Sequence, residues 1–318
     1  MEVNPRAKFR KSNRLRSATM AVFSDQDAKQ RAVEFLSDGI TIRGVLRLPS
    51  GEGPFPIVVL GHGLGALKEW TIPEVVDALV GVGIAGLSFD YRNVGDSDGL
   101  PRDEVAHHGR IEDWRSAVSY ASSLAQIDSD RIGIWGTSLG GRDVLALAAL
   151  DRRVKAVLAQ TPVIKWPAAL AARMAGYGDD LERYQIELAQ DHKDRTLGKE
   201  PRYVPFVKPT GDDVKDGYIK QLTKEELRNY TGRLTLQTYQ PTTLIDVIPL
   251  VKMIAPTPLR FVLAEQDFLP GQREAYDAAN EPKSLVTIEG HHFSPYMTSK
   301  DDATHAAKEF FAQNLRGQ

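Results

Sequence analysis

Ser138 is at the centre of a pattern that predicts nucleophilic catalysis. It is the middle residue of the pentapeptide 136–140, Gly-Thr-Ser-Leu-Gly, which follows the apolar run 132–135 and precedes the apolar run 144–150. The order strand, G-x-S-x-G, helix turns the chain sharply and exposes the serine hydroxyl, and the helix N-terminus favours negative charge that develops there. The glycines allow neighbouring backbone to approach closely. This pattern predicts that Ser138 is a nucleophile.

A nucleophilic serine needs a general base, and four histidines follow it in the chain: His192, His291, His292 and His305. His305 lies in an amphipathic pattern near the C-terminus, and His192 lies in a charged run, so we expect both at the surface. His291 and His292 follow the strand-like run 284–288, and a loop at a strand end is where a base is presented. Successive side chains of an extended loop point to opposite sides, so only one of the two can face the serine.

The expected order along the chain is nucleophile, acid, histidine. The apolar run 259–264 reads as a buried strand, and Glu265 and Asp267 follow it. Asp267 is further past the strand end, where a loop carboxylate can reach an imidazole. We therefore predict that Asp267 orients the histidine, with Glu265 as the rival.

The oxyanion of an acyl transfer needs two backbone N–H donors. Leu139, the residue after the serine, supplies one of them. The second is expected from the loop after the strand 56–60, where the glycine-rich run 61–65 frees the backbone, and we choose the N–H of Leu64. We expect His62 to have a structural role in placing that loop.

The same loop also fits a dinucleotide-binding pattern. Residues 61–66 satisfy G-x-G-x-x-G/A after a strand, and Asp90 ends the next strand as a ribose-binding acid would. That fingerprint requires a helix that begins within the glycine loop. Here a capping box at 71–74, with proline in the first turn, predicts a later start. A nucleotide-dependent reductase is therefore the disfavoured alternative.

The composition is that of an ordinary globular protein. The 318 residues are 42% hydrophobic and 26% charged, with a formal net charge of -2. That charge argues against nucleic acid or an anionic membrane as the principal partner. The chain has no cysteine, which excludes disulfides, thiolate nucleophiles and cysteine metal sites. No apolar run is long enough for a transmembrane helix and the N-terminus lacks a secretory signal, so we expect a cytoplasmic protein.

Residues 1–30 form a basic N-terminal extension. A transit peptide, an arm exchanged in a dimer and a solvated tail are all open for it, and a tail packed loosely on the body is the simplest interpretation.

From residue 31 the chain alternates between strands and helices. An Asp-Gly pair at 38–39 predicts a hairpin. The later alternation predicts a mostly parallel, doubly wound sheet covered on both faces. The alternation stops at 163–255, which is charged and helical and too long for a loop. We therefore predict a core of residues 31–162 and 256–318, with 163–255 as an inserted helical cap.

Side chains of the cap are candidates for an acyl pocket, although for most of them a place in the core of the cap is the simpler interpretation. The candidates are Trp166, Met174, Tyr177, Tyr184, Tyr203, Phe206, Tyr230, Tyr239 and Leu244. Trp166 is the one we select as substrate-binding.

Arg142 is a second substrate-binding candidate. It lies one helical turn after Ser138, and a guanidinium is expensive to bury without a partner. One interpretation is an ion pair with an acid of the cap or of a loop, with the adjacent Asp143 disfavoured because it points elsewhere on the helix. The other is that Arg142 holds a carboxylate or polar oxygen of the acyl group.

These residues carry a resemblance to the α/β-hydrolase superfamily that extends from the hairpin near residue 33 to the C-terminus. More narrowly, the chain is similar to the fungal polyketide transferase and thiohydrolase group, close to dienelactone-hydrolase-like esterases. The supporting segments are 61–66, 89–99, 151–157, 254–258, 281–283 and 292–296. In that group a glycine usually precedes the His-Phe pair, so the resemblance aligns His292 with the catalytic histidine and leaves His291 in the place of the glycine. Arg142 is a further departure, because related sequences usually have a small residue or histidine there.

The expected activity is hydrolysis of an ester or thioester through an acyl-enzyme, without metal or organic cofactor. The resemblance implies a small-molecule, polyketide-like acyl substrate, which a carrier protein can also present. An acyltransferase that passes the acyl group to an alcohol or amine is the alternative, and a hydrolase-fold receptor without turnover is a second. A homodimer is left open.

Overall fold

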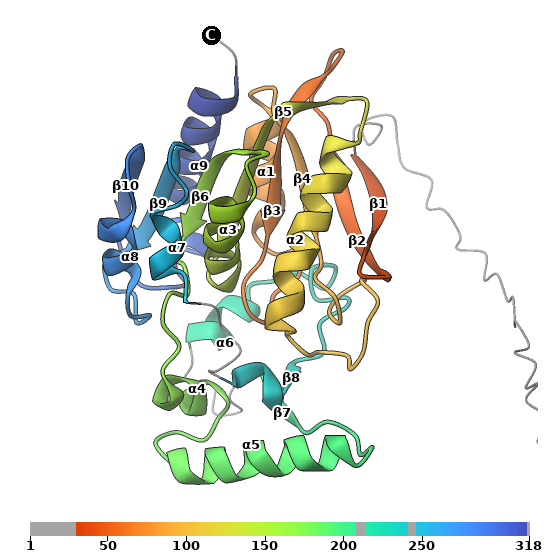
Figure 1. Ribbon diagram of the computed structural model, residues 1–318, viewed down its shortest axis with the longest axis vertical. Helices are drawn as coiled ribbons and strands as arrows, with labels where there is room; N and C mark the ends of the chain where they lie inside the picture. Colours follow the sequence, from red (N-terminus) through yellow and green to blue (C-terminus); the bar gives the residue numbers. More distant parts are fainter. Residues whose placement is uncertain (1–29, 208–213, 241–245, 317–318) are drawn as a thin grey trace, which may run out of the picture.

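The computed structural model describes residues 30–207, 214–240 and 246–316. Its centre is an eight-stranded sheet with the strand order β1-β2-β4-β3-β5-β6-β9-β10 (Figure 1). The strands are β1 (Gln30–Ser37), β2 (Ile40–Arg47), β3 (Phe55–Gly61), β4 (Ala85–Phe89), β5 (Ile127–Thr137), β6 (Val154–Gln160), β9 (Leu259–Ala264) and β10 (Lys283–Ile288).

The sheet begins with the predicted hairpin. β1 and β2 pair in antiparallel register, with Phe35 opposite Ile42. Asp38 and Gly39 at the turn have φ of 49° and 79°. A two-residue hairpin turn with positive φ at both positions matches the twist of the strands, which is why an Asp-Gly pair is favoured there.

The other six strands run parallel to one another, and β2 joins them antiparallel to β4. All residues of β4 and all but the first of β3 are buried. Strands covered on both faces need apolar side chains on both sides, so they read as continuous apolar runs. The carboxyl ends of these strands meet at one edge of the sheet, where ligands bind in such folds.

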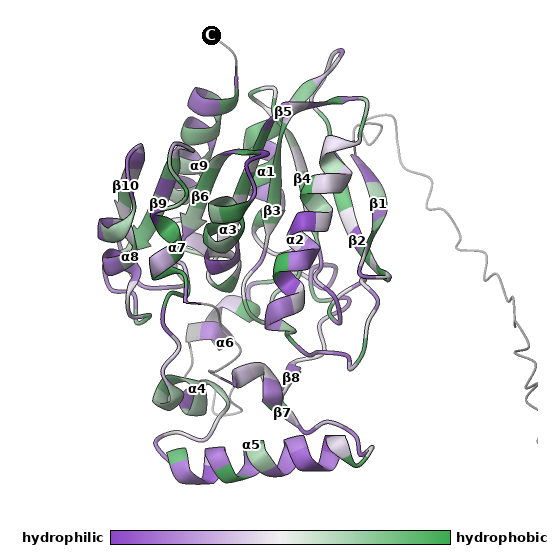
Figure 2. Cartoon of the chain, viewed as in Figure 1, coloured by the Kyte–Doolittle hydropathy of each residue, from purple (hydrophilic) through white to green (hydrophobic). Residues whose placement is uncertain are grey.

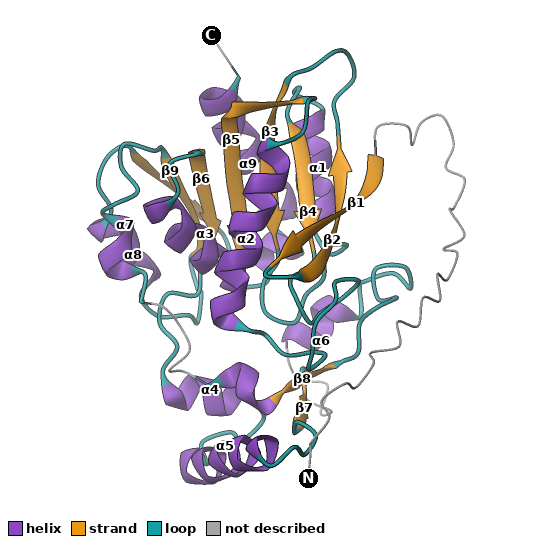
Figure 3. Ribbon diagram, turned by 45° about the vertical axis from the view of Figure 1, so that its right-hand side comes forward, coloured by secondary structure: helices purple, strands orange, loops and turns teal. Residues whose placement is uncertain are grey.

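Helices cover both faces of the sheet (Figure 3). They are α1 (Ile72–Val80), α2 (His107–Ser122), α3 (Leu139–Leu150), α8 (Gln272–Ala278) and α9 (Lys300–Leu315). Side chains of α2, α3 and α8 pack in one apolar cluster, and those of α1 and α9 pack in a second. The predicted fold class, a mostly parallel sheet wound on both faces, is confirmed.

The segment between β6 and β9 contains several elements, which are short apart from α5 (Leu181–Thr196). They are α4 (Ala168–Met174), α5 (Leu181–Thr196), β7 (Tyr203–Pro205), α6 (Val214–Ile219), β8 (Arg233–Thr235), the 3-10 helix η2 (Leu236–Tyr239) and α7 (Ile248–Val251). Figure 1 shows α4, α5, α6 and the β7-β8 pair gathered below the sheet. Figure 2 shows that α5, at the far end, is mostly hydrophilic. Most of this segment has an apolar cluster of its own.

Three details differ from the sequence-based expectations. The small β7-β8 sheet was not predicted, because each of its strands has only three residues. α7 lies within the range predicted as cap, yet Val251 packs in the cluster of the main sheet. Thr71 makes no side-chain cap on α1, because its hydroxyl bonds to Tyr218 Oη at 2.6 Å instead. The division into a core and a cap at 163–255 stays a prediction, and the extension 1–30 lies outside the described residues apart from Gln30.

Candidate active site

Ser138 connects the end of β5 to the start of α3 in a strained backbone conformation, with φ 55° and ψ -116°. A positive φ is unfavourable for a residue with a Cβ and persists only where the surroundings enforce it. Here the backbone N–H of Ser138 donates to Gln160 O at 2.9 Å, and its carbonyl accepts from the N–H of Val163 at 2.9 Å. These bonds to the end of β6 and the residues after it fix the turn that exposes the hydroxyl.

The two glycines of the pattern are required by close packing. A Cβ at Gly136 would collide with the carbonyl oxygen of Gly140, and a Cβ at Gly140 would lie 2.6 Å from Gly61 O. Neither backbone neighbour can move without disturbing β3 or α3. The spacing in the sequence therefore reflects steric necessity at this turn.

The structure brings the three predicted triad residues into one hydrogen-bonded chain. His292 Nε2 lies 3.0 Å from Ser138 Oγ, and His292 Nδ1 lies 2.9 Å from Asp267 Oδ2. The side chains of both Asp267 and His292 are 5% exposed. The neutral tautomer that fits these partners carries its proton on Nδ1 and accepts from the serine hydroxyl at Nε2. This arrangement can move a proton from Ser138 to His292.

The carboxylate of Asp267 is held in its charged form. Burial alone would raise the pKa of Asp267, but the hydrogen bond from His292, the positive charge of that ring when it is protonated, and the donors of Leu269 and Gln272 together outweigh burial and lower it. Its oxygens also accept from the N–H of Leu269 at 2.9 Å and from Gln272 Nε2 at 3.0 Å. An ionised carboxylate with these donors keeps the imidazole oriented and stabilises its protonated form.

The two rivals for these positions do not reach the serine. The His291 side chain faces its own loop. Its ring Nδ1 accepts from the backbone N–H of Phe293 at 3.2 Å, and the backbone N–H of His291 donates to Ser294 Oγ at 2.9 Å. Glu265 is exposed at the end of β9. The geometry therefore favours His292 and Asp267.

The loop after β3 presses against the nucleophile. A Cβ at Gly63 would lie 2.9 Å from Ser138 Cβ, so glycine permits the approach. Leu64 follows it and lines the same cavity as Ser138. Leu139 is the first residue of α3, and such an N–H has no acceptor within its own helix. Both predicted donors are beside the serine, and their role in binding an oxyanion stays a prediction.

His62 supports this loop from beneath. It is 2% exposed, and its Nδ1–H donates to Gly63 O at 2.9 Å. Burial lowers the pKa of His62 to about 4, with Arg110 and Lys68 adding to the effect against Asp90. The ring is therefore neutral at neutral pH, which fits the predicted structural role.

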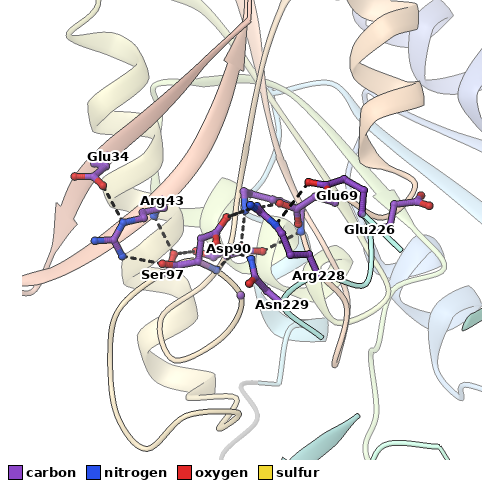
Figure 4. A network of polar contacts seen from close by, with 12 residues as sticks. Glu34, Arg43, Glu69, Asp90, Ser97, Glu226, Arg228 and Asn229 are labelled. Atoms are coloured by element: carbon purple, nitrogen blue, oxygen red, sulfur yellow. Dashed lines mark hydrogen bonds and ion pairs between the residues drawn. The ribbon is translucent and has the colours of Figure 1, made fainter. Parts of the chain in front are cut away.

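Lys68 anchors the far end of the same loop. Its ammonium lies 2.8 Å from Asp90, 2.6 Å from Asp96 and 2.7 Å from Glu69. Asp96 also accepts from Asn229 Nδ2 at 2.6 Å, a residue of the inserted segment. Figure 4 shows Asp90, Glu69 and Asn229 among the side chains of this network. The loop that carries Leu64 is thereby bonded to Asp90, directly after β4, and through Asp96 to the inserted segment.

Glu69, Asp90 and Asp96 are also close enough to one another to hold a metal ion. Oxygens of Glu69, Asp90 and Asp96 lie within 4.8 Å of one another. The Lys68 ammonium contacts all three, so the cation that these carboxylates require is supplied by the chain itself. Asp90 is fully buried in this network, and α1 begins only at Ile72. A ribose-binding role for Asp90 does not fit this arrangement.

A cavity of about 70 Å³ opens over Ser138 and His292. The strand-end loops and the inserted segment both contribute to its lining, and apolar and aromatic groups dominate it. The lining residues include Trp70, Val163, Trp166, Met174, Phe206, Tyr218, Ile219, Phe268, Leu269, Phe293 and Tyr296. Apolar walls with a few polar groups are typical of a small-molecule site.

Trp166, one of the two predicted substrate contacts, lines this cavity, as do Met174 and Phe206. Tyr184 and Tyr239 instead fill the apolar cluster of the inserted segment, where Tyr184 Oη donates to Tyr239 O at 2.9 Å. Tyr177 and Tyr230 pack partly against that cluster, Tyr203 lies beneath the Arg233 guanidinium, and Leu244 lies outside the described residues.

Arg142, the other predicted contact, is not brought to the cavity. It is 1% exposed and pairs with Asp143, whose Oδ1 lies 2.5 Å from Arg142 Nη2. The expectation that Asp143 is not the partner of Arg142 was wrong, because the long arginine side chain folds back along the helix to reach it. Arg110 Nε reaches the other oxygen of Asp143 at 2.6 Å. Burial would raise the pKa of Asp143, but these two guanidinium groups lower it.

Sequence reasoning missed Lys215, Tyr218 and Tyr296 as residues of the cavity. Tyr296 Oη bonds to Thr137 Oγ1 at 2.6 Å, next to the nucleophile. Tyr296 is four residues after His292, and this short distance in the sequence is the one feature that could have predicted its place near the nucleophile. Lys215 and Tyr218 lie on α6, a helix of six residues whose sequence has no feature that points to a site.

In the described ranges 30–207, 214–240 and 246–316, no helix has both the length and the apolar character that a membrane span requires.

The chain is similar in sequence to several known proteins. The Quorum-quenching protein AidA of Acinetobacter baumannii is 36% identical over 230 residues, 66% of this chain and 75% of that protein. The Thiohydrolase aneE of Aspergillus aculeatus is 31% identical over 300 residues, 89% of this chain and 92% of that protein. The Polyketide transferase grgF of a Penicillium species is 30% identical over 271 residues, 81% and 87% of the two chains.

A crystal structure of the alpha/beta hydrolase GrgF from Penicillium superposes on this structure with a TM-score of 0.76 at 28% identity, over 91% of this chain and 99% of that one. Residues 56–240 match the family described as the alpha/beta hydrolase fold. The family match spans the glycine loop after β3, the turn at Ser138 and most of the inserted segment. Together with the fungal thiohydrolase and polyketide transferase relatives, it confirms the resemblance seen in the sequence. The chain belongs to the alpha/beta hydrolase family.

Proposed function

We propose that this protein is a serine hydrolase that cleaves an ester or thioester through an acyl-enzyme. The observation that carries the proposal is the continuous chain Asp267–His292–Ser138, with contacts of 2.9 and 3.0 Å, at the floor of an apolar cavity. A histidine that is oriented by a carboxylate and bonded to a strained serine is the arrangement that makes a hydroxyl nucleophilic.

In the first half of the reaction, Ser138 Oγ attacks the carbonyl carbon and its proton passes to His292 Nε2. The carbonyl becomes an oxyanion that the N–H groups of Leu64 and Leu139 receive. Collapse of this intermediate breaks the bond to the alcohol or thiol, which leaves with the proton from His292. The products of this half are the free alcohol or thiol and an acyl ester on Ser138.

In the second half, water gives a proton to His292 and attacks the acyl ester. The new intermediate collapses to the free acid, and Ser138 recovers its proton from His292. No electrons are exchanged, and the net reaction consumes one water molecule. Asp267 remains ionised and stabilises the charged imidazole in both halves.

The relatives support a thioester or ester of a polyketide-like acyl group as substrate, since one is named a thiohydrolase and another a polyketide transferase. The second name also supports transfer of the acyl group to an alcohol or amine, which differs only in the acceptor that attacks the acyl-enzyme. Presentation of the acyl group by a carrier protein and assembly of a homodimer belong to the same proposal.

The test is covalent labelling with a fluorophosphonate probe, followed by peptide mapping. We expect label on Ser138 in the wild type, none on Ser138→Ala, and full labelling of Ser123→Ala, which changes an exposed serine at a helix end. Ser138→Ala should also lower kcat for p-nitrophenyl esters and acyl thioesters by several orders of magnitude.

Adding an alcohol or amine to the assay distinguishes hydrolysis from acyl transfer. Hydrolysis predicts free acid as the main product at every acceptor concentration, whereas an acyltransferase makes a new ester or amide. Near wild-type turnover by folded Ser138→Ala would contradict the serine mechanism. Absence of both labelling and turnover in the wild type would favour a binding protein without catalysis.

A further inference from the structure

The loop that presents Leu64 leaves the sheet where β3 ends. Gly61 is the last residue of β3 and pairs with Gly136 of β5. The loop then lies against the first turn of α3, since a Cβ at Gly140 would be 2.7 Å from His62 O. A backbone donor can receive an oxyanion only if its N–H points to the place where the negative charge develops. The direction of the peptide groups in this loop is therefore decisive for the proposed reaction.

Two side-chain donors orient these peptide groups. The Nδ1–H of His62 donates to Gly63 O at 2.9 Å. In a trans peptide the carbonyl and the N–H of the next residue point in opposite directions, so this bond turns the N–H of Leu64 away from the His62 ring. Arg110 Nη2 donates to His62 O at 3.1 Å and orients the preceding peptide group in the same way. The direction of the Leu64 N–H thus depends on His62 and, through His62, on Arg110.

Arg110 joins this loop to the helix that begins after the nucleophile. It is a residue of α2, and its Nε donates to Asp143 Oδ2 on α3 at 2.6 Å. A guanidinium presents its N–H donors in one rigid plane, so a single side chain can hold a carboxylate and a carbonyl at fixed positions. Arg110 therefore ties His62 O to the helix that starts directly after Ser138.

The guanidinium has little freedom to move. Arg110 is 2% exposed, and the Asp143 side chain is fully buried. Arg110 Cζ lies 3.4 Å from the centre of the Tyr91 ring, where the electrons of the ring attract a cation. The Tyr91 hydroxyl in turn accepts from Trp114 Nε1 at 3.0 Å. The His62 ring packs on Tyr91 as well, with the two ring centres 4.7 Å apart, so Tyr91 supports both residues that orient the loop.

We propose that Arg110 is a positioning residue for the oxyanion site: bound to Asp143, it holds the His62 carbonyl so that the Leu64 N–H faces the oxygen of the carbonyl that Ser138 attacks. This inference rests on the serine-hydrolase function proposed above and adds the group that aligns one of its two donors. Arg110 is not among the described residues that line the cavity over Ser138, so it acts on the reaction through the loop.

The experiment compares two inhibitors of matched size, trifluoromethyl butyl ketone and the alcohol formed by its reduction. Ser138 Oγ adds to the ketone carbon, its proton passes to His292, and the ketone oxygen becomes an oxyanion. The alcohol has no carbonyl group, so it fills the cavity without forming an oxyanion. The readout is the ratio of the inhibition constants of ketone and alcohol, together with kcat/KM for a p-nitrophenyl ester.

We expect Arg110→Lys to raise the inhibition constant of the ketone by about 10- to 100-fold, because a displacement of about 1 Å at a reaction centre can cost about 100-fold. The constant of the alcohol should stay at the wild-type value, and kcat/KM for the ester should fall with the affinity for the ketone. Lysine keeps the charge but replaces the planar fork with a single nitrogen, so it does not reproduce both bonds. Asp143→Asn keeps the volume and removes the charge that holds Arg110. It should change the ratio in the same direction, and it serves if Arg110→Lys does not fold.

The matched control is Arg92→Lys. Arg92 also pairs with a fully buried carboxylate, Asp113 of α2, through Nε at 2.9 Å and Nη2 at 2.8 Å. Its Nη2 reaches Ser37 and Asp38 at the β1-β2 hairpin rather than the carbonyl of His62. General loosening around α2 would therefore appear in both arginine variants, whereas loss of the oxyanion geometry should appear in Arg110→Lys alone. Urea unfolding compares the stability of the two variants.

An unchanged ratio in folded Arg110→Lys and Asp143→Asn would overturn the inference, as would an equal change in Arg92→Lys. Equal losses of affinity for ketone and alcohol would also overturn it, because they would show general damage to the cavity. These results remain distinct from failure of the proposed function. If wild-type protein hydrolyses the ester and is labelled at Ser138, the serine mechanism stands and only the role of Arg110 is in question. If it does neither, the serine mechanism itself is wrong.

Discussion

Replacing Asp267 with asparagine tests the proposed mechanism most directly, because the structure determines how the new amide must sit. Asp267 Oδ1 accepts from the N–H of Leu269 at 2.9 Å, so the amide oxygen of the variant is expected at that position. The NH2 group then takes the place of Oδ2, which faces His292 Nδ1 at 2.9 Å. Gln272 Nε2 donates to the same Oδ2 at 3.0 Å, so the Gln272 amide must turn its oxygen towards the new NH2 group. An amide donor there forces Nδ1 to accept, which moves the ring proton to Nε2.

A proton on Nε2 blocks catalysis, because this nitrogen must accept the proton of Ser138 across 3.0 Å. The same wrong tautomer lowers turnover by about 10⁴-fold in serine proteases. That factor corresponds to about 5.4 kcal/mol of transition-state stabilisation, since each tenfold change is worth about 1.36 kcal/mol. We expect a loss of this order in kcat/KM for p-nitrophenyl esters with little change in the folded structure.

The assay measures ester hydrolysis and the rate of fluorophosphonate labelling, with urea unfolding as the test of folding. The matched control is Glu265→Gln, which changes the exposed rival acid on the same loop and should retain wild-type activity. A loss of less than about tenfold in folded Asp267→Asn would refute the role given to this carboxylate, because the wrong tautomer leaves no base for Ser138. A large loss in Glu265→Gln would transfer that role to Glu265.

Three further predictions concern the framework of the site. Gly136→Ala places a Cβ against Gly140 O, so we expect loss of folded protein on expression, measured against Gly217→Ala, where a Cβ meets no atom within 4 Å. Burial lowers the pKa of His62 from 6.5 to about 4 and that of His107 from 6.5 to about 3. Just below pH 6.5 the two imidazoles are therefore protonated in the unfolded chain but not in the folded protein. The free energy of unfolding should therefore fall as pH drops from 6.5 towards 4, and His107→Gln should show a smaller fall in urea titrations. Lys68→Met leaves buried carboxylates without their cation and should destabilise the fold by about 3–5 kcal/mol, whereas an unchanged urea midpoint would show that the network contributes little.

The sequence was sufficient for the parts of the site that lie directly at strand ends. Ser138 and Asp267 follow apolar runs that the sheet buries, and His292 follows the edge strand β10, of which only Ile288 is buried, so their place in space follows from the order of strands. A parallel sheet gathers the carboxyl ends of its strands at one edge, and a short loop then has little freedom. The choice between His291 and His292 needed the resemblance to a known family, because alternation on a loop permits either.

Residues of the inserted segment could not be placed in the same way. Apart from α5 their elements are short, as the six residues of α6 illustrate, and no periodic apolar pattern fixes the face that each helix turns to the cavity. Arg142 shows a different limit. Helical spacing correctly separates its Cβ from that of Asp143, but it does not describe a flexible side chain that can fold back to a neighbouring carboxylate.

The groups proposed to perform the reaction and those expected to select the substrate therefore have different structural origins. The first are fixed by the ends of strands and by glycines that admit no side chain. The second are set by contacts between the inserted segment and the glycine loop, such as that of Phe206 with Gly65. Substitutions in α6 need not disturb the turn at Ser138, because α6 is no part of the connection between β5 and α3. In the proposed mechanism hydrolysis and acyl transfer use the same reaction centre, so we expect the choice of acyl group and of acceptor to depend on the inserted segment.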